Sequence, residues 1–136
     1  RVLIGSGAAV NQTTTNDGES PLYIAAQEGY TEVVSLLINS GAAVNQATTE
    51  EGVTPLHVAA EEGHTKVVSL LIGGGAAVDQ ATTDDCASPL YIAAQEGHTK
   101  VVRLLISSGA AMNQARADGG ATPLYIAAEE GHTEVV

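Results

Sequence analysis

One pattern of apolar and polar residues recurs along the chain every 34 residues. Its clearest copy runs from Thr54 to His64: a hydroxyl residue, a proline, alternating apolar positions, two alanines, two acidic residues, then glycine and histidine. Equivalent copies begin at Ser20, Ser88 and Thr122. A fixed period of this size predicts a stack of units, each burying its apolar side against its neighbours.

The recurrent stretch predicts a short helix from about Pro55 to Glu62. Thr54 is placed to cap its first turn, and proline is favourable at the first helical position. The two central alanines are small enough to let another helix approach closely. Gly63 is expected to end the helix in the left-handed conformation that glycine adopts at little cost. A helix of about two turns is not stable alone, so neighbouring units must hold it.

A second helix is predicted immediately afterwards. Thr65 is expected to cap it and Gly75 to end it. Its apolar positions are Val67, Val68, Leu70, Leu71 and Ile72. Because these positions are too many for one apolar stripe, we expect contacts with the partner helix and with both adjacent units.

The polar stretch before each first helix, such as residues 46–52, predicts an extended finger with a turn at its tip. Gly18, Gly52 and Gly120 occupy equivalent positions in this turn, where a positive φ is expected. Cys86 takes the same position in the third finger. Its β-carbon should cost about 1 kcal/mol there, or change the turn type.

The period divides the chain into a single array of repeats. We expect the end of a truncated repeat, three full repeats and a final truncated repeat, over residues 1–11, 12–45, 46–79, 80–113 and 114–136.

These motifs resemble the ankyrin repeat family. The family's T-P-L-H-x-A-A, G-H, V-V-x-L-L and G-A-x-V-N elements correspond to residues 54–60, 63–64, 67–71 and 75–79. The resemblance implies an all-α solenoid of stacked helix-turn-helix pairs with projecting β-turn fingers. Fingers and first helices would line a concave face that binds other proteins. Tetratricopeptide repeats share the 34-residue period but use longer helices and large aromatic residues that are missing here.

The chain departs from the family pattern in three respects. The usual period is 33 residues, and the additional residue falls in the finger. Cys86 stands at a glycine position. The family's histidine survives only as His57, whereas Tyr23, Tyr91 and Tyr125 replace it in the other repeats. Where tyrosine stands, the hydroxyl-to-imidazole bond expected of the motif is lost.

The composition narrows the choice of partners. The chain carries 16 acidic and five basic residues, a formal net charge of −11. This balance argues against nucleic acid and against anionic membrane surfaces, both of which require basic residues. The single cysteine permits no internal disulfide and favours a reducing compartment, so we expect an intracellular, cytoplasmic protein.

No residue type forms a convincing catalytic, cofactor or metal site. His64, His98 and His132 recur at one repeat position, so about 8–10 Å should separate successive side chains, too far to share a metal. We expect them, and His57, to be structural corner histidines bonded to adjacent backbone. Acidic neighbours should make Cys86 a poor nucleophile.

Two ligand loops are also excluded. The glycines at 73–75 follow a helix and lack the lysine of a phosphate loop. No 12-residue calcium loop is present. We therefore expect a non-enzymatic protein without cofactors or metals.

The carboxylates are the most informative feature, because 13 of the 16 fall on fingers and first helices. Of the basic residues, only Arg116 lies on a finger. The predicted partner-binding residues are Asn16, Asp17, Glu19, Gln27, Glu28, Glu50, Glu51, Val53, Glu61, Glu62, Asp84, Asp85, Gln95, Glu96, Asp118, Glu129 and Glu130, with Tyr23, His57, Tyr91 and Tyr125 as additional candidates.

Several functions remain open from the sequence. The leading hypothesis is a protein-interaction scaffold whose acidic concave face binds a partner with a basic surface. Alternatively, the carboxylates only keep an alanine-rich stack soluble. The array could also be a spacer, or assemble head-to-tail through uncapped ends, since residues 133–136 followed by 1–4 read as one continuous helix. An engineered binding scaffold and the targeting segment of a larger enzyme are further alternatives.

Overall fold

The structure, a computed structural model covering residues 1–136, is built from eight helices. The helices are α1 (Val2–Gly5), α2 (Pro21–Glu28), α3 (Thr31–Asn39), α4 (Pro55–Glu62), α5 (Thr65–Gly73), α6 (Pro89–Glu96), α7 (Thr99–Ser107) and α8 (Pro123–Glu129). This order confirms the all-α array of helix pairs expected from the 34-residue period.

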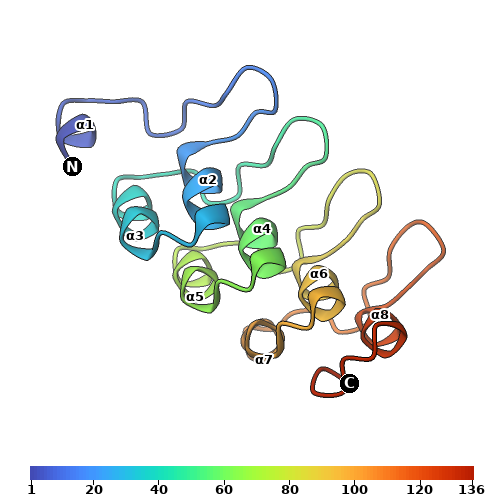
Figure 1. Cartoon of the computed structure of the whole chain (residues 1–136). Helices are drawn as coiled ribbons and strands as arrows, with labels where there is room; N and C mark the ends of the chain where they lie inside the picture. The colour runs from blue at the N-terminus through green and yellow to red at the C-terminus, as the bar shows by residue number, and fades with distance from the viewer.

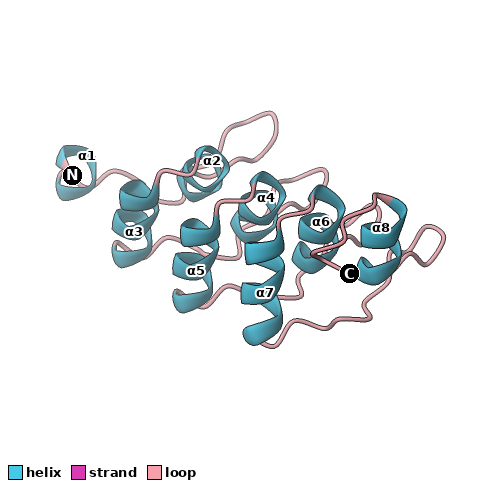
Figure 2. Cartoon of the chain, turned by 60° about the horizontal axis from the view of Figure 1, so that its bottom comes forward, coloured by secondary structure: helices cyan, strands magenta, loops and turns pink.

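The helices form two rows. The first helices of the repeats, α2, α4, α6 and α8, lie side by side in one row, and α3, α5 and α7 form the second row (Figures 1 and 2). The fingers connect the second helix of one repeat to the first helix of the next. They all extend beyond the first helices in the same direction (Figure 1). The two termini lie at opposite ends of the stack (Figure 1). Because each first helix packs against the next first helix, equivalent repeat positions follow one another along the stack.

The first helices begin and end as their sequences predict. The side-chain oxygens of Ser20, Thr54, Ser88 and Thr122 each accept a hydrogen bond from the backbone N–H three residues later, at 3.1–3.2 Å. Proline follows each cap at the first helical position. Gly29, Gly63 and Gly97 end α2, α4 and α6 with φ of 74–75°. Local residues therefore fix both ends of α2, α4 and α6, whereas α8 has the same start but ends at Glu129, before Glu130 in a right-handed conformation.

The second helices differ from the prediction at their starts. Thr65 is the first residue of α5, and the preceding His64 occupies the cap position without a capping side-chain bond. The Thr65 N–H is already bonded to the Gly63 carbonyl at 3.0 Å. The predicted Thr65 cap is thus wrong, because the tight turn at Gly63 leads directly into the helix. At the other end, α5 stops at Gly73, and Gly75 adopts φ 96° just beyond it.

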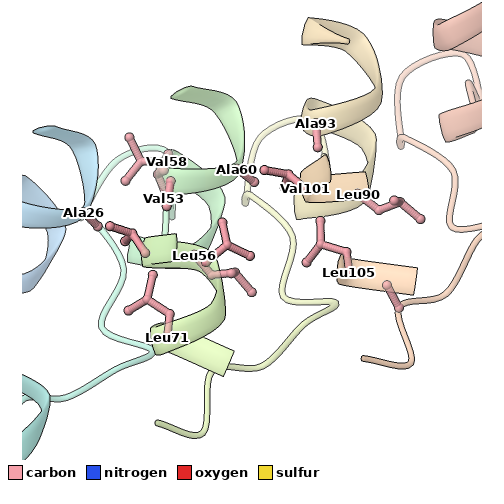
Figure 3. Packing of buried hydrophobic residues seen from close by; sticks show 14 of the residues in the cluster. Ala26, Val53, Leu56, Val58, Ala60, Leu71, Leu90, Ala93, Val101 and Leu105 are labelled. Atoms are coloured by element: carbon pink, nitrogen blue, oxygen red, sulfur yellow. The ribbon is translucent and has the colours of Figure 1, made fainter. Parts of the chain in front are cut away.

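A continuous apolar core lies between the two rows (Figure 3). The alanine pairs of α2, α4 and α6 are buried, as expected for residues that allow close helix packing. Leu56 and Leu90 from the first row are 1% and 2% exposed, and Leu71 and Leu105 from the second row are completely buried. This thin aliphatic layer explains how the chain folds with four tyrosines and no other aromatic residue.

Backbone hydrogen bonds hold the fingers closed and tie them together. Each finger is closed by one bond, such as Thr48 N–H to the Val53 carbonyl at 3.0 Å. Between fingers, the N–H groups of Thr49, Thr83 and Ala117 donate to the carbonyls of Asp17, Glu51 and Asp85 at 2.9–3.1 Å. The fingers therefore form a connected series rather than independent loops.

Cys86 adopts the positive φ predicted for its turn. Its φ is 56°, and it is the only residue other than glycine with a positive value. In the first two fingers, a β-carbon at the equivalent glycine would lie 2.6 Å from a methyl group of Thr49 or Thr83 in the next finger. The next finger after Cys86 carries Ala117 at that position. The smaller side chain leaves room for the Cys86 β-carbon.

Candidate partner-binding surface

The predicted partner-binding residues occupy the fingers and the ends of the first helices. Exposed members are Asn16, Asp17, Glu28, Glu50, Glu51, Glu62, Asp84, Glu96, Asp118, Glu129 and Glu130; Glu19, Gln27, Glu61, Asp85 and Gln95 are half-buried; and Val53 is buried. Tyr23, His57 and Tyr91 are buried and Tyr125 is exposed. We call the exposed and half-buried carboxylates among these residues the acidic surface. By contrast, Lys66, Lys100 and Arg103 project from α5 and α7.

Carboxylates from different repeats lie close enough to influence one another. The pKa of Glu61, at the end of α4, is raised by burial and then by the charges of Glu62, Glu96 and Glu51. These neighbours come from the same helix, from α6 and from the second finger. The negative potential therefore extends across adjacent repeats.

The first two fingers and Tyr23 of α2 line a cavity of about 140 Å³ that is open to solvent on one side. Its lining residues are Asp17, Glu19, Tyr23, Thr48, Glu50, Glu51 and Val53. Four of these side chains are carboxylates and none is basic. Burial, followed by the charges of Glu19, Glu61, Glu51 and Asp17, raises the pKa of the Tyr23 hydroxyl. The cavity thus combines an aromatic ring with uncompensated negative charge.

In the last two fingers, two acidic side chains are paired with a basic side chain of the chain itself. The Arg116 guanidinium lies 2.8 Å from carboxylate oxygens of both Asp85 and Asp118. Its central carbon is 5.3 Å from the centre of the Tyr91 ring, within the range of a cation–π contact. The sequence placed Arg116 on a finger but did not reveal this role. A comparison of the repeats shows that Arg116 is the only basic residue at its repeat position, which marks it as unusual without identifying its contacts.

Asp85 is also held by its own finger. Its carboxylate accepts hydrogen bonds from the Thr82 hydroxyl and from the Ala87 N–H. Burial raises the pKa of Asp85, but these bonds and the Arg116 charge outweigh it and leave the pKa below its ordinary value. Asp85 is therefore a fixed anion. Cys86, beside it, is a half-buried free thiol.

Three of the four histidines are structural, as predicted. The Nε2 atoms of His64, His98 and His132 lie 2.9, 2.8 and 2.8 Å from the backbone carbonyls of Gln27, Glu61 and Gln95, each in the preceding repeat. Each imidazole consequently bridges two repeats at the end of a first helix.

His57 differs from the prediction. It lies inside α4 and is 4% exposed, and neither ring nitrogen has a hydrogen-bond partner. The Thr54 hydroxyl oxygen accepts the backbone N–H of His57 but makes no hydrogen bond to the imidazole. The expectation of a corner histidine bonded to backbone is therefore wrong for His57, and the hydroxyl-to-imidazole bond of the motif is not made. At the same repeat position, Tyr23 and Tyr91 are buried.

The outermost repeats expose apolar side chains. Val2 and Leu3 of α1 are 82% and 74% exposed, and a groove of about 290 Å³ at the other end is lined largely by apolar residues, among them Met112 and Leu124. Head-to-tail self-association through these surfaces stays a prediction. None of the helices has the length and apolar character needed to span a lipid bilayer.

The class of protein follows from this architecture: it is an α-helical solenoid built from repeats. Its short helices form two rows, glycines make the turns between them, and hydrogen bonds connect its fingers. A comparison of the sequence with known protein families supports this class. The family described as "Ankyrin repeats (3 copies)" matches residues 1–82 and 78–136, so the chain belongs to the ankyrin repeat family. Such repeats generally mediate protein–protein interactions. A search of curated proteins found no match.

Proposed function

We propose that this ankyrin array is a non-enzymatic scaffold whose acidic surface binds a protein with a basic surface. The observation that carries the proposal is the grouping of carboxylates from successive repeats around Glu61, whose pKa is raised by burial and by three other acidic side chains. Like charges held this close repel one another, so a basic partner relieves the repulsion when it binds. The connected fingers should limit the ordering cost of binding.

Long-range attraction of this kind raises the association rate more than it raises the affinity. The alternative is that the carboxylates only maintain solubility. The two functions differ in whether the position of the charge matters. Solubility depends on total charge, whereas recognition depends on where the charge lies.

The test uses a capped lysine-rich peptide as the probe and stopped-flow fluorescence to measure its association rate. Replacing Glu61 and Glu62 by lysine should slow association and reduce its dependence on salt. The matched control replaces Glu32 and Glu134 by lysine, because these exposed residues lie outside the fingers and first helices but produce the same change in net charge. Equal effects of the two double variants would contradict the proposal.

A further inference from the structure

The cavity between the first two fingers has the same design as the Arg116 site, two repeats earlier in the chain. A shift of 68 residues places Tyr23 at the position of Tyr91, and Asp17 at the position of Asp85. The same shift relates Glu50 to Asp118. The aromatic ring and both carboxylates that contact the guanidinium are thus repeated around the cavity.

The residue that supplies the cation differs between the two places. Thr48 stands where Arg116 supplies the guanidinium, and its hydroxyl oxygen accepts the Val53 N–H instead of filling the space. The cavity of about 140 Å³ lies against this residue. Tyr23 is 9% exposed, compared with 3% for Tyr91, whose ring faces Arg116.

The cavity is also more acidic than the occupied site. The positions equivalent to Glu19 and Glu51 are Ala87 and Gly119, which carry no charge. Four carboxylates therefore line the cavity without a basic residue, whereas Asp85 and Asp118 share Arg116. The electrostatic reason to bind a cation is stronger here.

We infer that this cavity binds the guanidinium group of an arginine from a partner protein, stacked on Tyr23 and paired with Asp17 and Glu50. The inference rests on the proposed function, because it names the partner group that one part of the acidic surface recognises. Arginine suits this arrangement better than lysine, since a planar guanidinium can contact two carboxylates while stacking on a ring. The chain itself displays that geometry at Arg116.

The first experiment fills the cavity from within. The probe is a capped Gly-Arg-Gly peptide, and chemical shifts of the Thr48 amide and the Tyr23 ring report binding to the whole chain. Thr48→Arg should place an internal guanidinium in the cavity and abolish these peptide-induced shifts. Two further peptides carry lysine or citrulline in place of the arginine. The lysine peptide should bind the wild-type protein more weakly than the arginine peptide, and the uncharged citrulline peptide should not bind.

The second experiment opens the occupied site. Arg116→Thr should create a second binding site and raise the stoichiometry from one peptide to two. The matched control is Arg103→Thr on α7, which removes the same charge from an exposed helix and should leave the stoichiometry unchanged. A second site in both variants, or in neither, would contradict the inference.

A third variant guards against misfolding of Thr48→Arg. Asp17→Asn combined with Glu50→Gln keeps the side-chain shapes and should weaken the arginine peptide about tenfold, as expected from losing two charge pairs. Unchanged affinity would overturn the cavity assignment. If the Glu61 and Glu62 reversal still slows the lysine-rich peptide, only this inference fails. If neither set of variants changes binding, the proposed function fails as well.

Discussion

The imidazole of His98 lies directly against the α-carbon of Gly63. A β-carbon at Gly63 would come within 2.6 Å of the His98 Nδ1 atom, and the His98 Nε2 atom is 2.8 Å from the Glu61 carbonyl. The same relationship joins Gly29 to His64 and Gly97 to His132. Glycine is therefore required twice at this corner, once for its φ of 75° and once for the space that histidine occupies.

Gly63→Ala should destabilise the protein through both effects, whereas Gly131→Ala should show only the first. Gly131 has a φ of 74°, but a β-carbon at this residue would have no atom within 4 Å. Backbone strain should cost about 1–2 kcal/mol in each variant, and displacement of His98 should add about 1–3 kcal/mol at Gly63. Urea unfolding of both variants tests this. Equal losses of stability would show that the histidine contact is unimportant.

Cys86→Gly should stabilise the protein by about 0.5–1 kcal/mol, because glycine accepts the positive φ without strain. Ala117→Thr should be destabilising in wild type, where the threonine methyl group would meet the Cys86 β-carbon. The same change should be tolerated in the Cys86→Gly background, which restores the pairing of the first fingers. A double-mutant cycle measures this coupling. Additive effects would mean that positions 86 and 117 are independent.

The protein should lose stability in mild acid because His57 is buried in its neutral form. Burial lowers the pKa of its imidazole to about 4, against opposing effects of Asp85 and Asp84. Between pH 6.5 and 4 the unfolded chain binds a proton at His57 that the folded chain does not, so stability falls as pH decreases through this window. At about 1.36 kcal/mol per pKa unit, the loss approaches about 3 kcal/mol near pH 4.

The measurement compares urea unfolding of wild type and His57→Gln across this pH range. Both proteins share the titrating carboxylates, so the difference between their pH profiles isolates the histidine. The variant should lose less stability than wild type on acidification. Parallel profiles would show that the imidazole is protonated in the folded protein as easily as in the unfolded chain.

Leu56 and Leu124 occupy the same repeat position in very different surroundings. Leu56 is 1% exposed and Leu124 is 59% exposed. Leu56→Ala should cost about 2–5 kcal/mol, because it leaves a cavity between packed layers. Leu124→Ala should cost less than about 1 kcal/mol, since its side chain already contacts solvent. Thermal unfolding of the two variants provides the comparison, and similar losses would contradict this account of the core.

The sequence was sufficient for the fold because each structural unit is local and repeated. The hydroxyl cap, proline start and glycine end of α4 lie within ten residues, and three further copies support the same assignment. The start of α5 was predicted wrongly because threonine has a strong capping preference, whereas the structure already satisfies the Thr65 N–H through Gly63. A local propensity was overridden by an adjacent turn.

The candidate site was less accessible from the sequence, because it depends on distances between repeats. The set of carboxylates was evident, but it gave no reason to connect Asp17 and Glu50 with Tyr23 rather than with other acidic residues. Contacts of Arg116 supplied that reason. The prediction for His57 was wrong for a related reason: the family motif suggests a bonded imidazole, but the side-chain geometry within the buried helix leaves both ring nitrogens without a partner.

A series of main-chain hydrogen bonds connects each finger to the next. Asp17, Glu51 and Asp85 accept these bonds with their backbone carbonyls, which leaves their carboxylates available for other contacts, such as the pairing of Asp85 with Arg116. The side chains at the tips of the fingers can therefore be exchanged while the backbone bonds between the fingers remain. Arg116 and Thr48 occupy the same repeat position: the arginine fills one site from within the chain, whereas the threonine leaves the equivalent cavity open to a partner's side chain.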